Sequence, residues 1–260
     1  MDFEDCQEPR LSFGNAAGLY DRVRPGYPQE AVRWILEPAG PAPLRVVDLG
    51  AGTGILTRVL LSLGHTVIPV EPDPEMRAQM IAVTPGTMPL DGCAESIPVP
   101  DGSVDAVLAG QAYHWFDVER AHPEIARTLR PGGVFGPIWN DRDENVSWLA
   151  ELSLIANGLA GRHGNPQPDP SSVEPWFAPV EQATFRHSTS HTVESLVELI
   201  TSRSYYLTAP PERQAKIRSA VRTLASDHPD LEGHSEFDLP YLTKAYRTTL
   251  VPPERRSTRP

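Results

Sequence analysis

Cysteine is scarce in this chain: Cys6 and Cys93 are the only two among its 260 residues. Two thiols cannot build a disulfide framework or a multi-thiolate metal site within one chain. No His pair with a nearby Asp or Glu has convincing metal-ligand spacing, so we expect no bound metal. No apolar run approaches the ~18–20 residues that span a bilayer, and the acidic start lacks a secretory signal. We therefore expect a cytoplasmic protein with no membrane partner.

Positive charge is also in short supply. Lys and Arg number 23 against 34 Asp and Glu, which gives a formal net charge of −11 at pH 7. A nucleic-acid partner requires clustered positive charge, so this balance argues against one. With 40% hydrophobic residues, 19 glycines and 28 prolines, the composition is typical of a loop-rich globular protein. Its length suits one large domain, or one domain with an insertion.

Apolar strands and helices alternate over the first 140 residues. The predicted strands are 45–49, 66–70, 104–109 and 134–139, and the predicted helices begin at Pro28 or span 54–63, 75–83 and 119–129. Alternation of this kind is typical of an α/β protein, in which a mostly parallel sheet carries helices on both faces.

The pattern changes after Asn140. Residues 157–179 are rich in Gly, Pro and polar side chains, which indicates an irregular insertion or lid. Apolar spacing behind Thr192 predicts an amphipathic helix with Thr192 as its N-cap, and a second helix follows Pro211. Two further strands, predicted at 183–188 and 242–250, close the sheet, with the last one as an antiparallel edge.

A glycine-rich turn follows the first predicted strand. The segment VVDLGAGTG places Gly50, Gly52 and Gly54 where backbone can approach a ligand that any Cβ would displace. The third glycine of a dinucleotide fingerprint would fall at Ile55, which argues against NAD. Glu71 ends the second strand, 21 positions after Gly50, and can accept both ribose hydroxyls of an adenosine. Its carboxylate would repel a 2′-phosphate, which argues against NADP.

Four ordered motifs carry a family resemblance. They are VVDLGAGTG, Glu71-Pro72, GCAESIPVPDGSVDAVLAGQAYHWFD and IARTLRPGGVFGPIWN. Together they resemble class I S-adenosylmethionine-dependent methyltransferases, most closely the small-molecule enzymes that include ubiquinone-biosynthesis and trans-aconitate methyltransferases. The resemblance covers residues 12–147 well and the remainder loosely.

This resemblance implies a fold and a division of the chain. The expected core is a Rossmann-like seven-stranded, mostly parallel sheet with its last strand antiparallel, and it binds the cofactor across the carboxyl ends of the strands. Residues 1–43 would form an arm and a helix over the cofactor. The core would comprise 44–140 and about 181–250, and a helical cap over the acceptor would lie within about 141–236.

The resemblance also implies a cofactor site for S-adenosylmethionine, with S-adenosylhomocysteine as product. The glycine turn would hold the methionine part, Glu71 the ribose, and the segment around Ala94 the adenine. The residues so implied are Tyr20, Arg24, Asp48, Gly50, Gly52, Thr53, Glu71, Pro72, Met76, Ala94, Glu95 and Gln111.

The acceptor site would lie just beyond the fourth strand. The residues predicted to contact the acceptor are Tyr20, Tyr113, His114, Trp115, Trp139, Asn140, Tyr205 and Tyr206. Methyl transfer from a sulfonium depends mainly on positioning, with His114 as an optional general base and the Tyr113 hydroxyl as a further catalytic group. The expected acceptor is a small molecule, an aromatic secondary metabolite or its precursor, and the expected assembly is a monomer or homodimer.

Two alternatives remain open at this stage. A protein of this fold can bind the cofactor and catalyse a non-methylating reaction, or only regulate, and release of S-adenosylhomocysteine during acceptor turnover separates these cases. A nucleotide-dependent oxidoreductase is the other alternative, which Ile55 disfavours and NAD binding would test.

Overall fold

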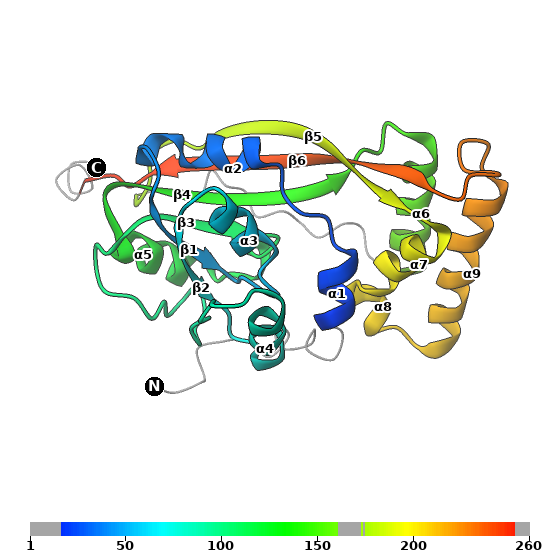
Figure 1. Cartoon of the computed structure of the whole chain (residues 1–260), viewed down its shortest axis with the longest axis horizontal. Coiled ribbons are helices and arrows are strands. Elements are labelled where there is room, and N and C mark those ends of the chain that lie inside the picture. Colours follow the sequence, from blue (N-terminus) through cyan, green and yellow to red (C-terminus); the bar gives the residue numbers. More distant parts are fainter. Residues whose placement is uncertain (1–16, 161–172, 174, 253–260) are drawn as a thin grey trace.

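The computed structural model describes residues 17–160, 173 and 175–252. Its centre is a six-stranded sheet with the strand order β2-β1-β3-β4-β6-β5 (Figure 1). The strands are β1 (Arg45–Leu49), β2 (Thr66–Val70), β3 (Val104–Gly110), β4 (Leu129–Arg142), β5 (Glu181–His191) and β6 (Phe237–Thr249). Strands β1 to β4 pair in parallel, whereas β6 runs antiparallel to β4 and to β5. The predicted antiparallel direction of the last strand is therefore confirmed.

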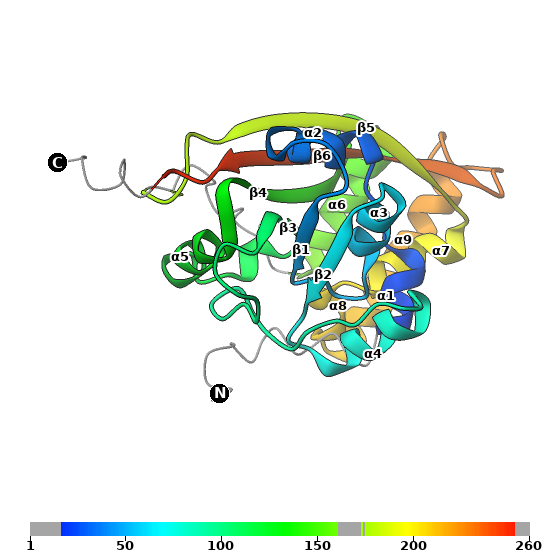
Figure 2. The ribbon, with the colours of Figure 1, turned by 60° about the vertical axis from the view of Figure 1, so that its left-hand side comes forward.

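Helices cover both faces of this sheet. They are α1 (Ala17–Val23), α2 (Gln29–Leu36), α3 (Ile55–Ser62), α4 (Pro74–Val83), α5 (Val118–Thr128), α6 (Ser147–Ala160), α7 (Val193–Thr201), α8 (Ser204–Leu207) and α9 (Pro211–Asp227), with short 3-10 helices η4 (Glu37–Ala39) and η5 (Tyr113–Trp115). Figure 2 shows α2 and α3 on one side of the strands and α5 on the other.

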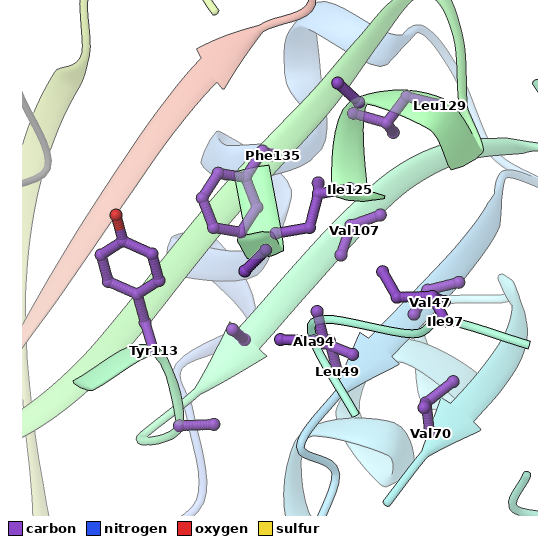
Figure 3. Close-up of a cluster of buried hydrophobic side chains, with 14 of the residues drawn as sticks. Val47, Leu49, Val70, Ala94, Ile97, Val107, Tyr113, Ile125, Leu129 and Phe135 are labelled. Carbon is purple, nitrogen blue, oxygen red and sulfur yellow. The ribbon is translucent and has the colours of Figure 1, made fainter. Parts of the chain in front are cut away.

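Successive residues of each central strand serve opposite faces. Val46 belongs to the apolar cluster under α2 and α3, whereas Val47 belongs to the cluster under α5. Figure 3 shows this second cluster, in which Val107 and Phe135 face Ile125 of α5. Because both faces are buried, the strands read as continuous apolar runs in the sequence.

A third apolar cluster joins four helices beyond the carboxyl end of β4. We call it the helical core; its members include Trp148, Leu149, Leu196, Leu199, Ile217, Val221 and Tyr206. Figure 1 shows α6, α7, α8 and α9 grouped there, with α1 between this group and α4. The predicted cap of α7 is confirmed: Thr192 Oγ1 accepts a hydrogen bond from Ser195 N at 3.2 Å.

Two expectations about the sheet are wrong for the described residues. The sheet has six strands instead of seven, and beyond β2 there is only an isolated parallel bridge between Val70 and Leu90. The predicted last strand is also interior, because β6 pairs with β4 on one side and with β5 on the other. The edge of the sheet is β5, whose side chains alternate between half-buried and exposed.

The structure describes only part of segment 157–179, which the sequence predicts as an irregular insertion or lid. Helix α6 runs to Ala160, and residues 161–172 and 174 lie outside the described residues. Val173 and Phe177 are buried in the cluster under α5, where the Phe177 ring lies 5.6 Å from that of Phe135. This part of the segment completes the core, because its apolar side chains fill the α5 face of the sheet.

Candidate functional site

The glycine turn connects β1 to α3. Gly50, Gly52 and Gly54 all have positive φ, at 68°, 56° and 87°. A Cβ added to Gly50 would lie 2.7 Å from the Cβ of Ala112, so the turn packs directly against the end of β3. A Cβ added to Gly52 would meet no atom within 4 Å. Gly52 therefore presents bare backbone to open space, as a ligand cradle requires.

Two acidic side chains are buried beside this turn. Asp48 accepts a hydrogen bond from Thr57 Oγ1 at 2.6 Å, and its Oδ1 has no partner among the described residues. Glu71 accepts from the backbone N–H groups of Gly52 at 2.8 Å and Asp73 at 2.9 Å. Burial raises the pKa of each carboxyl to about 7. Buried acids with unused acceptor capacity are costly, and a ligand that donates hydrogen bonds offsets that cost.

Helix α1 is fastened to the same turn. Asp21 Oδ1 accepts from Thr53 Oγ1 at 2.7 Å and from Arg58 Nη2 at 2.6 Å. Arg58 Nη1 also donates to the carbonyl of Thr53 at 2.9 Å. The N-terminal helix therefore closes one side of the site through side chains on α1 and α3.

The residues predicted around the adenine lie on two segments. Pro72 and Met76 follow β2, with Pro72 half-buried and Met76 buried on α4. Figure 3 shows Ala94 next to Leu49, near the carboxyl end of β1. Glu95 is buried, and its Oε1 accepts from the backbone N–H of Asp117 at 2.8 Å, so part of its carboxylate is engaged across the chain.

The end of β3 carries an unusual backbone. Gln111 has a φ of 55°, and it is the one non-glycine residue with positive φ among those described. Its Nε2 donates to the carbonyl of Asn140 at 3.0 Å, which ties the ends of β3 and β4 together. Non-glycine residues in the left-handed region cost about 1–3 kcal/mol and concentrate at functional sites. The sequence motif located Gln111, and its strained backbone supports a role at the site.

His114 lies on η5, close to Gln111 in sequence. It is half-buried, its ring lies 5.1 Å from that of Trp115, and Trp139 Nε1 donates to its Nδ1 at 3.5 Å. Burial lowers the pKa of His114 to about 4. The imidazole is therefore neutral at pH 7 with its proton on Nε2, and it is a weak base.

Two of the predicted acceptor contacts are core residues. Tyr113 has no exposed surface, and its hydroxyl lies 2.8 Å from His122 Nε2. Figure 3 shows the Tyr113 ring in the cluster with Phe135. Trp139 is 1% exposed and packs edge-on to Tyr113 with 6.1 Å between ring centroids. The structure therefore places both aromatic side chains under the site, where they support η5 and β4.

Of three further residues predicted to contact the acceptor, Asn140 and Tyr206 are hydrogen-bonded within the protein, and Tyr205 is not. Asn140 is tightly held: its Nδ2 donates to Gly26 O at 2.9 Å, and its Oδ1 accepts from Thr243 Oγ1 at 2.7 Å. Tyr205 is half-buried and its hydroxyl has no partner among the described residues. Tyr206 points into the helical core, where its hydroxyl accepts a hydrogen bond from the guanidinium of Arg218 on α9.

A pocket of about 430 Å³ opens at the end of β4. Its lining residues are Asn140, Asp141, Arg142, Glu144, Asn145, Arg203, Leu242 and Lys244. Arg24 and Tyr20, both predicted at the cofactor, lie near it: the Arg24 guanidinium stacks 4.5 Å from the Tyr20 ring centroid and donates to Ser202 O at 3.5 Å. The pocket therefore adjoins the arm that closes over the glycine turn.

Several residues at the site were missed by the sequence analysis. Asp21 and Arg58 form the fastening of α1, but 37 positions separate them and nothing in the sequence pairs them. Arg203 lies between α7 and α8, and its proximity depends on tertiary packing. Arg142 carried a usable signal: it lies two residues after Asn140 in a strand, so the two side chains share a face.

The described part of the chain holds neither a metal-ligand cluster nor a helix that could span a membrane. No group of three or more His, Cys, Asp or Glu side chains is placed there to hold a metal ion. No helix there is both long enough and apolar enough to cross a bilayer.

Known proteins resemble this chain along almost its whole length. A family model, the methyltransferase domain, matches residues 47–136. An uncharacterized methyltransferase of Mycobacterium tuberculosis is 46% identical over 241 residues, which cover 93% of this chain and 96% of that protein. An uncharacterized methyltransferase-like protein of Schizosaccharomyces pombe is 32% identical over 245 residues, 90% of this chain and 93% of that protein.

A solved structure has the same fold. It is a protein of Anaeromyxobacter dehalogenans, described as a candidate type II methyltransferase, with a TM-score of 0.66 and 24% identity. The match covers 86% of this chain and 97% of that one. The mixed sheet with its parallel strands β1 to β4, the glycine turn and the acid after β2 are typical of one class: the class I S-adenosylmethionine-dependent methyltransferases. With the near full-length similarity to the mycobacterial and yeast proteins, this chain belongs to that family and is an enzyme of it.

Proposed function

We propose that the protein transfers a methyl group from S-adenosylmethionine to a small-molecule acceptor bound at the end of β4. The observation that carries the proposal is the pairing of the open Gly52 backbone with two buried acids, Asp48 and Glu71, at the carboxyl ends of β1 and β2. The acidic net charge of the chain supports a small molecule over a nucleic acid.

The residues present fit this cofactor. Asp48 Oδ1 is buried without a partner and is placed to accept from the ammonium of the methionine part. Glu71 uses each oxygen for one backbone N–H, so each keeps a lone pair for a ribose hydroxyl. We place the adenine beside the half-buried Pro72, with the buried side chains of Met76 and Ala94 beneath it. When bound, the cofactor supplies an activated methyl group on a sulfonium.

The protein contributes mainly position. The fastening of α1 through Asp21 holds the arm against the glycine turn, and holding two reactants at attack distance supplies up to ~7–11 kcal/mol. Neutral His114 bears its proton on Nε2 and serves best as a hydrogen-bond donor to the acceptor. Proton removal by His114 stays an optional step, limited to acceptors whose proton becomes strongly acidic as the methyl group transfers.

The helices after β4 form the acceptor side of the site. We assign α7 and α8, with Tyr205, to a cap that excludes water and selects the acceptor. The expectation of an aromatic acceptor depended on Tyr113 and Trp139, and their burial gives it no support. The polar lining of the pocket supports a polar metabolite instead.

Calorimetric titration with S-adenosylmethionine and S-adenosylhomocysteine tests the cofactor site. We expect about micromolar binding that Glu71→Ala weakens at least tenfold, because the variant leaves the ribose hydroxyls unpaired. Glu75→Ala, which removes the same charge from an exposed position on α4, is the matched control and should bind like the wild type. Absence of binding by the wild-type chain would refute the proposal. Release of S-adenosylhomocysteine during an acceptor screen then separates methyl transfer from binding alone.

A further inference from the structure

Three arginines meet beside the predicted cofactor site. Arg24 follows α1, Arg142 ends β4 and Arg203 connects α7 to α8. Burial, and next the charge of Arg203, lower the pKa of Arg24 to about 10. The same two causes lower the pKa of Arg142. Two contacts bring them together, although 179 positions separate Arg24 from Arg203: Arg24 donates to the carbonyl of Ser202, the residue before Arg203, and Arg142 lines one pocket with Arg203.

None of these guanidinium groups has a carboxylate within salt-bridge distance in the described part of the chain, although the nearby charge of Glu144 opposes the lowering of the Arg142 pKa. Nε of Arg24, Nη1 of Arg142 and Nε of Arg203 are each buried without a hydrogen-bond acceptor, as is the hydroxyl of Tyr205 beside them. Arginines that stabilise a fold are normally paired when buried, because an uncompensated buried charge costs several kcal/mol. A cluster of unpaired donors therefore indicates a binding site for an anion.

The nearby carboxylates do not neutralise this cluster. Asp141 pairs with Lys244 at 2.7 Å, and Asp143 pairs with Arg186 at 3.1 Å. Glu144 lines the pocket but is exposed. Beside the Asp141–Lys244 pair, the pocket lining holds Glu144 against Arg142 and Arg203, so positive charge is in excess there.

Arg142 is one of the residues that line the pocket at the end of β4. Asn140 and Arg142 lie on the same face of β4, because they are two residues apart. Arg142 is also opposite Tyr241 of β6, whose ring stacks on His187 of β5 with 5.3 Å between centroids. Cross-strand partners share a face of the sheet, so Tyr241 lies beside Arg142, and both Arg142 and Arg203 line the pocket.

We propose that Arg142 and Arg203, with Arg24 and the Tyr205 hydroxyl, bind an anionic group, a carboxylate or a phosphate, of the methyl acceptor. The proposal moves Arg24 to the acceptor from the cofactor, where the family resemblance places it. The inference rests on the proposed methyl-transfer function and names its substrate class. Planar guanidinium groups donate two parallel hydrogen bonds to such anions, and the pocket of about 430 Å³ accommodates a small metabolite.

Calorimetry on the full chain, with and without S-adenosylhomocysteine, tests this proposal with malonate, inorganic phosphate and neutral malonamide as probes. We expect malonate or phosphate to bind in about the millimolar range that so small a ligand reaches, and malonamide not to bind. Tighter malonate binding supports a carboxylic acceptor, and tighter phosphate binding supports a phosphorylated one. Equal binding of malonate and malonamide would overturn the proposal.

Matched variants locate the anion. Arg142→Gln and Arg203→Gln should each weaken anion binding by about tenfold or more, whereas Arg222→Gln, at an exposed position on α9, should not change it. Removing one of three unpaired like charges should also leave the melting temperature equal or higher. A lower melting temperature with unchanged anion binding would make the arginines structural and refute the site.

The two proposals fail separately. A chain that binds S-adenosylhomocysteine but neither anion refutes the subsite and leaves methyl transfer standing. A chain that binds the anions but not S-adenosylhomocysteine keeps the subsite and refutes the cofactor site.

Discussion

The two sides of the proposed site differ in the groups that form them and in how far apart those groups lie in the sequence. At the ends of β1 and β2, backbone N–H groups and two acids within 48–73 form the proposed cofactor side. At the end of β4, side chains from the residue after α1, from β4 and from the α7–α8 connection form the proposed acceptor side. The cofactor side depends on local turns, and the acceptor side depends on long-range packing. Backbone recognition suits a constant cofactor, whereas side chains on separate elements can be changed one at a time to suit a different acceptor.

Among the substitutions considered, we expect Gly50→Ala to weaken the cofactor side most. The change forces an alanine into φ of 68° and places its Cβ 2.7 Å from Ala112. Strain of about 1–2 kcal/mol and the clash together should weaken S-adenosylhomocysteine binding about 100-fold by calorimetry. Gly64→Ala shares a positive φ of 84° but meets no atom within 4 Å, so it should lose stability and keep its affinity. Equal affinities in the two variants would contradict this account of the turn.

A second prediction concerns Asp48 and pH. Burial raises its pKa to about 7, so the folded chain binds this proton more tightly than the unfolded chain does. Ionisation therefore destabilises the fold as pH rises from about 4 to 7. Asp48→Asn removes that cost, and its stability relative to the wild type should grow across this window by about 2–4 kcal/mol. Urea unfolding at several pH values measures the difference. Asp238→Asn, at an exposed position, should show no such growth.

The fastening of α1 should have a smaller effect. Asp21→Asn weakens two charge-assisted hydrogen bonds of a half-buried pair, which should cost about 1–2 kcal/mol of stability and lower cofactor affinity. Arg22→Gln breaks the ion pair with Glu198, whose side chains are 63% and 44% exposed, and should cost under about 0.5 kcal/mol. Thermal unfolding and calorimetry compare the two. A larger loss in Arg22→Gln would show that α1 is held from its other side.

Two adjacent tyrosines, Tyr205 and Tyr206, test which side chains form the acceptor side. Tyr205→Phe removes a hydroxyl near Arg142 and should weaken malonate binding about fivefold. Tyr206→Phe removes the hydrogen bond from Arg218 in the helical core, and should lower stability by about 1 kcal/mol without changing malonate affinity. If Tyr206→Phe were the variant that weakened malonate binding, the assignment of Tyr205 to the pocket and of Tyr206 to the helical core would be wrong.

The sequence predicts the local features of the cofactor side better than the long-range packing of the acceptor side. Strands β1 and β2 have the predicted bounds, and Gly50 and Glu71 lie where their spacing placed them, because glycine turns and buried strands are local features. Tyr113 and Trp139 were predicted as contacts but are core residues, because the motif gives their position in the chain and not the rotation of each side chain. Arg203 was missed, since only the packing of α7 against α1 brings it to the site.

Helix α1 has only seven residues, yet both sides of the site use it. Asp21 fastens it to the glycine turn, and Arg24 follows at its end beside Arg203. A ligand that orders this helix from one side lowers the entropy cost that the other ligand must meet. We therefore expect positive cooperativity between cofactor and acceptor. By thermodynamic linkage, each raises the affinity of the other by the same factor.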